Sequence, residues 1–502
     1  MPLVSELASE AIRTLIDSYT AQVKYLMTPV YNVKGFGARG DGVTDDTAAI
    51  QAAIDAAEVA GGMVFVPPGI YITTATLTIQ ASSVVVVGIH FCSVIKCIDG
   101  TKDILKIGVN DSENGSLVYF NGVYGLQLTR DSIPTAAVCG IRLTGARNGY
   151  YENIFLTKQK VGILLEKDSG ENTFSHIQVR EGVSGLQVDG TTSVISARPS
   201  NVDNTFYNLM CYGLTGIAVY FFGSNIGDCF FDHLKAIGCK YGVVIEYIAS
   251  GRSPGDYYYN FEFDAPIIDS CLYHGIHASN VSGVNIKDGW IASNGTEGTE
   301  IANIKLSGCT KSLIADCDIR HSDHGIDLYK CSEITVGGCD ILDILNNGCG
   351  VRLFGSTNCK INDNTFKDVP SVNIQLIEQD TVVVANNEFT NNRIVGGLYG
   401  IQSTTGSDNN NFVEGNVITG VSDFPLALSA NNNIGFNHLN DKAYFKIGNK
   451  IHYFGTAAPT TGTWNTGDII YNTNPAAGGY IGWVCVAGGT PGTWKTFGAI
   501  SA

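Results

Sequence analysis

A near-repeat of 22 residues restricts the folds that this chain can adopt. Cys309 and Cys331 are separated by 22 residues, as are Cys317 and Cys339, and each pair lies in matching surroundings. A unit of this length, made of short apolar segments and turns rich in Asn, Gly and Asp, cannot bury its own apolar face. It must therefore stack on its neighbours.

Three tripeptides occupy the same place in successive units: Ile304-Lys305-Leu306, Ile326-Asp327-Leu328 and Val351-Arg352-Leu353. In a β-strand, alternate side chains point to opposite faces, so the outer two residues of each tripeptide point inward and the middle one outward. We therefore predict an all-β fold, a parallel β-helix in which matching strands lie above one another.

Composition agrees with a solenoid and excludes several partners. At 502 residues the chain exceeds the usual size of one globular domain, but a solenoid grows by adding coils. The net charge of −16, with no run of Lys or Arg, argues against nucleic acid and anionic membranes as partners. No apolar run is long enough to insert into a membrane, and the opening Met1-Pro2-Leu3 does not begin a signal peptide. We predict synthesis in the cytoplasm.

The 14 cysteines fall at repeat spacing, mostly in apolar positions. A reduced cysteine in such a position behaves as a small hydrophobic residue, and no CxxC pair has zinc-site spacing. We predict buried free thiols and no cofactor. The identity of any metal stays open: acidic loops are compatible with calcium, although no EF-hand spacing exists.

Three regions are expected along the chain. Residues 1–28 have the apolar spacing of an amphipathic helix, which either packs on the end of the β-helix or bundles with copies of itself. Residues 29–440 form the β-helix, of which 29–80 are its N-terminal cap. Residues 441–502 are a Gly/Thr/Trp-rich β module for trimerisation or glycan binding, whose aromatic residues either bind glycan or form its core.

Asn32 to Thr47 read NVKGFGARGDGVTDDT, and Met63 to Tyr71 read MVFVPPGIY. This stretch resembles the N-terminal signature of pectate-lyase-like right-handed β-helix proteins, which include bacteriophage tailspikes and tail depolymerases. The resemblance implies a right-handed helix and a homotrimer in the virion tail, beside other tail or baseplate proteins. It also implies a substrate, bacterial surface polysaccharide. In that family the segment caps the first coil, so its acidic residues, Asp41, Asp45 and Asp46, are expected to be structural.

Outward positions of successive strands form columns spaced ~4.8 Å apart. One column contains four ionisable residues in a row, and we predict that these are catalytic. For β-elimination from a uronic acid, Arg352 or Lys305 neutralises the sugar carboxylate, His277 or Lys305 is the base, and Asp327 orients a cation. The structural alternative is a salt-bridge ladder from Lys305 through Asp327 to Arg352. The whole predicted column is Gln187, Ala218, Val244, His277, Lys305, Asp327, Arg352, Gln375 and Gln402.

A second column is the other candidate. Asp318 and Asp340 share a position, with Trp290 one unit before and Thr365 one unit after. Two carboxylates on neighbouring strands suit acid/base hydrolysis of a glycoside, with Trp290 as a sugar contact. Alternatively, both are solvated turn residues.

Irregular spacing predicts loops at Ser193 to Asn201 and at Ile248 to Asn260. Loops on a rigid scaffold often carry binding sites. The second loop contains Arg252 and the run Tyr257-Tyr258-Tyr259, which is suited to stacking on sugars. These four residues are predicted to bind substrate.

Together these features predict a phage tail depolymerase that cleaves bacterial surface polysaccharide by β-elimination. Two alternatives remain open. One is a glycoside hydrolase on the same scaffold, and the other is a receptor-binding tail fibre without catalytic activity.

Overall fold

The structure is a computed structural model, and the residues that it describes are 29–109, 117–191, 201–223, 226–246, 260–296, 300–378, 382–404, 408–429, 431–439, 444–447 and 450–502. The chain folds as two compact units, Met1–Thr205 and Phe206–Ala502. The predicted N-terminal helix at residues 1–28 lies outside the described residues.

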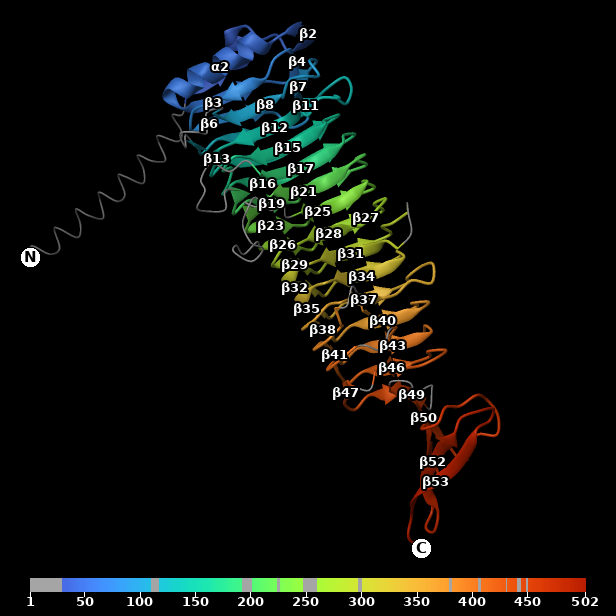
Figure 1. The fold of residues 1–502 in the computed structure, drawn as a ribbon. Coiled ribbons are helices and arrows are strands. Elements are labelled where there is room, and N and C mark those ends of the chain that lie inside the picture. The colour runs from blue at the N-terminus through green and yellow to red at the C-terminus, as the bar shows by residue number, and fades with distance from the viewer. Residues whose placement is uncertain are drawn as a thin grey trace, which may run out of the picture. The chain divides into compact units, whose positions relative to one another are not determined.

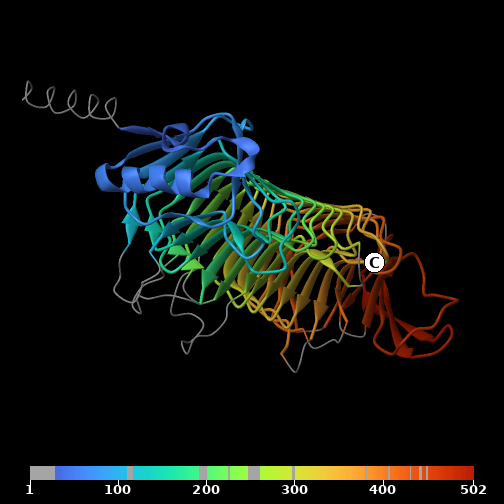
Figure 2. The ribbon, with the colours of Figure 1, turned by 90° about the horizontal axis from the view of Figure 1, so that it is seen from above.

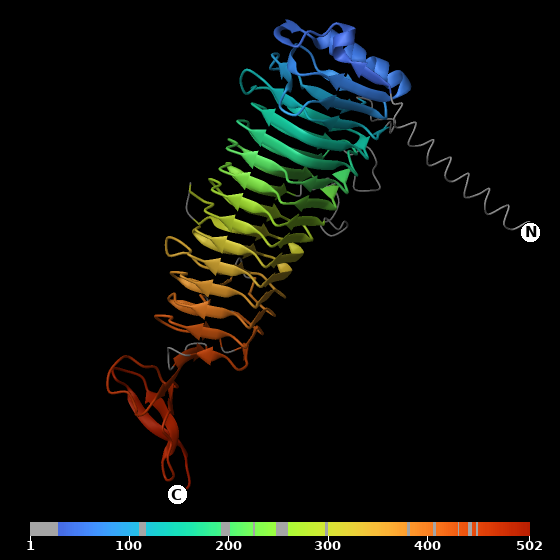
Figure 3. The same ribbon diagram turned by 180° about the vertical axis from the view of Figure 1, so that it is seen from behind.

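Both units are built from coils of short strands that pair in parallel with the coils before and after them. One coil of the second unit contains β32 (Thr310–Ala315), β33 (Asp318–Arg320) and β34 (His324–Tyr329), joined by short turns. Figures 1 and 3 show from opposite sides how the strands within each unit repeat from coil to coil. The predicted all-β solenoid is confirmed.

The sheet of the second unit that contains β34 carries the predicted catalytic column, and we call it the β34 sheet. Its strands are β21 (Ile217–Gly223), β25 (Tyr241–Glu246), β28 (Ile276–Ser279), β31 (Ala302–Ser307), β34 (His324–Tyr329), β37 (Val351–Phe354), β40 (Val372–Ile377), β43 (Tyr399–Ser403) and β46 (Leu426–Leu428).

The other strands of the second unit's coils form two further stacks. One stack is β24 (Lys235–Ile237), β27 (Ile267–Asp269), β30 (Trp290–Ala292), β33 (Asp318–Arg320), β36 (Asp340–Leu342), β39 (Thr365–Lys367), β42 (Arg393–Val395), β45 (Val417–Thr419) and β48 (His438–Leu439). The other is β23 (Cys229–Asp232), β26 (Phe261–Asp264), β29 (Val284–Lys287), β32 (Thr310–Ala315), β35 (Ser332–Gly337), β38 (Lys360–Asn362), β41 (Glu388–Thr390), β44 (Phe412–Glu414) and β47 (Asn433–Ile434).

The first unit has the same architecture, and it also carries a helix, which follows β1 (Val30–Asn32) and β2 (Asp41–Asp45). Helix α2 (Thr47–Ala60) packs its buried face, including Ile50 and Ile54, on the first coil. Figure 2 shows this helix lying across the neighbouring strands of its unit. One of its sheets contains, in order of pairing, β5 (Leu77–Ile79), β8 (Leu105–Gly108), β12 (Cys139–Thr144), β15 (Val161–Glu166) and β17 (Ser184–Gly190).

The three acidic residues of the N-terminal signature hold turns. Asp41 accepts hydrogen bonds from the backbone of Val43 and Thr44, at 2.9 and 2.8 Å. The buried carboxylate of Asp46 accepts two more from the chain before β2 (Asp41–Asp45), one of them from Gly40 at 3.0 Å. The Asp45 carboxylate accepts a hydrogen bond of 3.0 Å from the backbone N–H of Thr47. The structure therefore gives each of these residues a structural role.

At the turns, buried cysteine and asparagine side chains stack from one coil to the next and form ladders in place of larger apolar side chains. The 14 cysteines are free, and 13 of them are buried. In later coils asparagine takes the place of cysteine: the Asn364 side chain accepts a hydrogen bond of 2.9 Å from the backbone of Cys339. The Asn364 amide in turn donates to Asn392, at 3.0 Å. Each ladder satisfies turn N–H groups that burial removes from water.

Residues 450–502 form a small, mainly antiparallel sheet of β50 (Lys450–Gly455), β51 (Ile469–Asn472), β52 (Tyr480–Ala487) and β53 (Thr493–Ala499), next to β49 (Tyr444–Ile447). The rings of Trp464 and Trp494 meet edge to face, with centroids 5.3 Å apart. Both indole N–H groups donate to backbone carbonyls three residues earlier, at 2.9 and 3.0 Å. These two half-buried tryptophans therefore pack against each other on the small sheet.

Candidate functional site

The register of the β34 sheet aligns the predicted catalytic residues. Val244, His277, Lys305, Asp327 and Arg352 are paired from one strand to the next, and the column continues through Gln375 and Gln402. The matching tripeptides of the 22-residue repeat are thus neighbours in one sheet. This alignment was predictable because the strands from His277 onward keep the same apolar-polar-apolar pattern, although the spacing between them varies from 22 to 28 residues.

One member of the predicted column was wrong. Val244 pairs with Tyr220 and not with Ala218. The buried residues Val219 and Phe221 pair with Val243 and Ile245, so the sequence had been aligned two residues out of register. The apolar side chains on the inward face fix the register.

Arg352 is held by two carboxylates. Its Nε and Nη2 atoms donate to the two oxygens of Asp327, each at 2.7 Å, and Nη1 donates to Glu300. Asp327 is 3% exposed and Arg352 6%, although both point away from the interior of the coil. Neighbouring side chains cover this part of the outward face, so a substrate does not meet an open arginine here.

His324 completes this network. Its Nδ1 atom accepts a hydrogen bond of 3.0 Å from the backbone N–H of Cys349. Nε2 therefore carries the proton and donates to Glu300 at 3.1 Å. Burial first, and then the Arg352 charge, lower the pKa of His324. The Arg352 hydrogen bond is the main cause of the lowered pKa of Glu300.

Lys305 is separate from this network. In the described part of the chain, its ammonium group makes no ion pair or hydrogen bond, and the side chain is half-buried. The predicted ladder therefore forms only between Asp327 and Arg352. Its first step, from Lys305 to Asp327, is not made, because Asp327 uses both of its oxygens on Arg352.

His277 lies beside Lys305 in the column. Burial lowers its pKa to about 4, with further contributions from the positive charges of His274 and Lys305. Its Nε2 atom lies 3.2 Å from the hydroxyl of Ser279. The His274 ring lies 5.5 Å from it, centroid to centroid. A neutral imidazole is therefore placed beside a cation.

Small side chains flank this pair. The column next to His277 and Lys305 contains Ser279 and Ser307, which are paired in the register. Tyr329 follows in that column, with its ring centroid 6.1 Å from that of Phe354. The half-buried pair of His277 and Lys305 thus has small neighbours on one side and aromatic rings beyond them.

The second predicted column is also in register. Trp290, Asp318, Asp340 and Thr365 pair in sequence from β30 to β39. Arg320 donates hydrogen bonds to the carboxylate of Asp318 from Nε and, at 2.8 Å, from Nη2. The guanidinium carbon of Arg320 lies 5.5 Å from the centre of the Trp290 ring, which is 39% exposed. Asp318 is therefore engaged, whereas Asp340 is exposed.

The predicted substrate-binding residues of the second loop, Arg252, Tyr257, Tyr258 and Tyr259, lie outside the described residues. Most of the predicted loop at 193–201 lies outside them too. Their assignment as substrate-binding residues stays a prediction.

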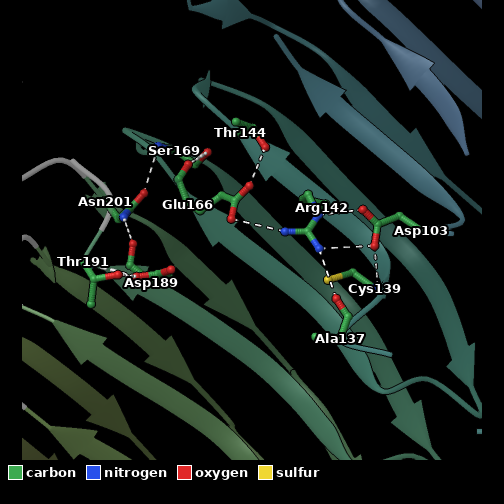
Figure 4. Close-up of polar contacts among 10 residues, drawn as sticks. All are labelled: Asp103, Ala137, Cys139, Arg142, Thr144, Glu166, Ser169, Asp189, Thr191 and Asn201. Atoms are coloured by element: carbon green, nitrogen blue, oxygen red, sulfur yellow. Dashed lines mark hydrogen bonds and ion pairs between the residues drawn. The ribbon is translucent and has the colours of Figure 1, made fainter. Parts of the chain in front are cut away.

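The first unit contains a second arginine held in the same manner, which we call the Arg142 cluster: Asp103, Arg142, Thr144 and Glu166 (Figure 4). Arg142 Nε donates to Asp103 at 2.6 Å, and Nη1 donates to Glu166 at 3.2 Å. Thr144 donates to the other oxygen of Glu166 at 2.9 Å. An arginine fixed by two carboxylates on an outward face is thus a recurrent structural device of this chain.

Three residues of the site were missed from the sequence. Glu300 precedes its strand and reaches Arg352 across two coils, which no repeat pattern reveals. His324 ends the string Arg320-His321-Ser322-Asp323-His324, whose short polar residues are typical of a turn. The turn is correct for His321 to Asp323, but His324 begins β34. His274 precedes a strand outside the repeated tripeptide.

Within the described ranges, no three His, Cys, Asp or Glu side chains lie together as a metal site would require. Calcium binding stays an untested prediction. No helix in those ranges has the length and apolar character needed to cross a bilayer.

Two family models match the chain. The one described as rhamnogalacturonase A/epimerase, pectate lyase-like, matches residues 30–243, and the right-handed β-helix region matches residues 274–441. Alginate lyase 7 of Azotobacter vinelandii is 45% identical over 107 residues, which are 20% of this chain and 12% of that protein. Mannuronan C5-epimerase AlgE5 of the same organism is 54% identical over 79 residues, 14% and 8% of the respective chains. The chain thus spans only a small part of these relatives.

Solved structures share the fold. The A-module of mannuronan C5-epimerase AlgE6 of Azotobacter vinelandii superposes with a TM-score of 0.53 at 20% identity, over 82% of this chain and 99% of that one. The N-terminal fragment of bacteriophage Phi29 gene product 12 gives 0.61 at 12% identity, over 83% and 74%. At these identities the likeness shows the fold alone. The matches confirm the resemblance: the chain carries a pectate-lyase-like region followed by a right-handed β-helix region.

Proposed function

We propose that this chain is a phage tail depolymerase that cleaves a bacterial surface polysaccharide by β-elimination at His277 and Lys305. The observation that carries the proposal is the neutral imidazole of His277 beside the ammonium group of Lys305, which has no ion-pair partner among the described residues, on one outward face. A uronate needs both groups: a cation for its carboxylate and a base for the proton next to that carboxylate.

The step follows from these positions. In the tautomer whose Nε2–H donates to Ser279, Nδ1 of His277 carries a lone pair and removes the proton from C5 of the uronate. The electron pair forms the C4=C5 double bond while the C4–O bond breaks, and the leaving oxygen takes a proton from water. Lys305 stabilises the negative charge that develops on the carboxylate. Asp327 and Arg352 hold the neighbouring surface in place.

The relatives favour elimination over hydrolysis. Their names describe a lyase and a C5 epimerase. Both reactions begin by removing the proton at C5 of a uronate, which a hydrolase does not do. The aligned segments are short, and what supports elimination is the class of reaction that the relatives' names describe.

Two observations support placement in a virion tail. A bacteriophage gene product shares the β-helix fold, and the N-terminal signature resembles tailspikes. A homotrimer in contact with other tail proteins, and a bacterial surface glycan as receptor, complete the proposal. Size-exclusion chromatography with light scattering of the full chain tests the trimer.

Incubation with purified capsule or wall polysaccharide tests the activity. Unsaturated ends that absorb ultraviolet light support elimination, and they should disappear in His277→Gln. New reducing ends without that absorbance would replace the proposal with hydrolysis. An unchanged chain length, with binding retained, would make the protein a receptor-binding fibre.

Hydrolysis is the second candidate, on Asp318 and Asp340. The pairing of the two carboxylates on adjacent strands, next to the exposed Trp290, favours hydrolysis. The ion pair between Arg320 and Asp318 argues against hydrolysis, because Asp318 is engaged by the guanidinium group and is not available as a proton donor. Asp340→Asn abolishes activity only if this second column is the active site.

A further inference from the structure

Aromatic rings lie on the β34 sheet two strands before His277. Tyr220 and Phe222 point outward from β21, with ring centroids 4.7 Å apart and planes inclined by 25°. Both rings are half-buried. Side chains of this kind offer a rigid apolar surface to the C–H face of a sugar ring.

A carboxylate lies between these rings and the proposed reactive pair. Glu246, on β25, accepts a hydrogen bond of 2.8 Å from the Tyr220 hydroxyl. In the register Glu246 pairs with Phe222 on one side and with Ser279 on the other. Ser279 is the residue that contacts His277. The Glu246 charge is therefore one strand away from the proposed base.

The Tyr220 hydroxyl acts as a donor to this carboxylate. Burial, followed by the Glu246 hydrogen bond and charge, raises the pKa of Tyr220, so the phenol keeps its proton. Among the described residues, no lysine or arginine is ion-paired with Glu246. A negative charge thus remains at this position. We call Glu246, Tyr220 and Phe222 the Glu246 subsite.

Strand spacing relates this subsite to the substrate. Neighbouring strands are ~5 Å apart, which is close to the length of one pyranose unit in an extended chain. When a uronate occupies His277 and Lys305, the next unit toward β25 lies at Glu246. A second uronate there would meet a carboxylate of the same sign, whereas the hydroxyl groups of an uncharged sugar can donate to it.

We infer that the Glu246 subsite binds an uncharged sugar, so that the substrate is a heteropolysaccharide in which a uronate is followed by a neutral unit. This inference rests on the proposed function for the location of the uronate. It separates the chain from enzymes of homopolymeric uronates. The protein's net charge of −16 acts in the same direction, because it disfavours a polymer with one negative charge on every unit.

Binding measurements on the full chain test the inference. His277→Gln serves as the background, so that cleavage does not disturb the equilibrium. The probes are hyaluronan, in which glucuronate alternates with an uncharged sugar, and polymannuronate, in which every unit is charged. We expect hyaluronan to bind about tenfold more tightly at low salt.

Variants assign the preference to the subsite. Glu246→Gln should tighten polymannuronate binding by roughly fivefold, since it removes one repulsive charge. Tyr220→Ala should weaken hyaluronan binding by about tenfold, and Tyr220→Phe by less, because the ring is kept. Glu414→Gln removes an exposed carboxylate from β44, outside the β34 sheet, and should change neither affinity.

Equal affinity for the two polymers, or an unchanged polymannuronate affinity in Glu246→Gln, would overturn the inference. So would the absence of binding to both. Failure of the proposed function has a different signature. If no glycan acquires unsaturated ends with the wild-type protein, but the preference and its loss in Glu246→Gln are observed, elimination is excluded and the subsite stands.

Discussion

The Arg352 guanidinium and the Asp327 carboxylate form two hydrogen bonds of 2.7 Å across neighbouring strands, and both groups are almost completely buried. Burial has removed both groups from water, so the attraction between the two charges is what offsets their lost hydration. From the sequence, the position of the two residues in the column predicted a catalytic role. Their buried hydrogen bonds indicate that the pair stabilises the outward face of the β34 sheet.

Removal of one partner should therefore destabilise the protein. We expect Arg352→Ala to lower the free energy of unfolding by about 3–5 kcal/mol, because it leaves Asp327 buried without its counter-charge. Urea denaturation measures this. Lys360→Ala removes one partner of an exposed pair with Glu388 and should cost less than about 1 kcal/mol. Equal effects of the two variants would contradict the structural assignment.

His277→Gln should reduce turnover by about 10²–10⁴-fold, as expected for loss of a general base, without lowering the melting temperature. The base works only when neutral. Since its pKa is about 4, the wild-type rate should rise as the pH increases through about 4 and should then level off. A rate that still rises steeply between pH 6 and 8 would show that another group is the base.

Lys305→Met should raise KM and lower kcat, because the ammonium group contacts the carboxylate both in the bound substrate and in the transition state. Lys305→Arg keeps the charge and should retain part of the activity. Steady-state kinetics at two salt concentrations are the measurement. An unchanged KM in Lys305→Met would remove Lys305 from the proposed site.

Acid should destabilise the fold through three histidines, of which His324 is buried and His274 and His277 are half-buried. Burial is the first cause of the lowered pKa values of His274, His277 and His324. The unfolded chain therefore binds more protons, and stability falls as the pH decreases from about 6.5 toward about 4. For His277 the loss is on the order of 2 kcal/mol by pH 4.5. Comparison of unfolding at pH 7 and 4.5 should show a smaller loss in His277→Gln, and an identical loss would contradict this account.

Thiol titration checks the cysteine positions. Cys92 is exposed and the other 13 cysteines are buried. We expect one thiol per chain to react with a thiol reagent in the native state and all 14 after unfolding. The Cys92→Ser variant should show no fast reaction. Several fast-reacting thiols in native protein would mean that the coils are packed less tightly than described.

The repeated apolar-polar-apolar pattern was sufficient to predict the parallel coils and the pairing of Ile304 with Ile326 and of Ile326 with Val351, because a repeated pattern of inward apolar residues must be stacked to be buried. The same pattern aligned Asp318 with Asp340, 22 residues apart, and His277 with Lys305, 28 residues apart. At Tyr220 the residues on both sides of the strand are apolar or aromatic, so the inward packing had to be known before the register was correct.

Sequence alone therefore determined the fold, the order of residues from Val244 to Gln402 in the first column, and the order from Trp290 to Thr365 in the second. Only the tertiary structure decided which of those residues are engaged. Glu300 reaches Arg352 from another coil and also accepts a hydrogen bond from His324, and the contact between Glu300 and Arg352 distinguishes a buried, saturated arginine from the half-buried Lys305 beside His277. Such contacts depend on how side chains from distant positions fill one surface, and a periodic pattern carries no information about them.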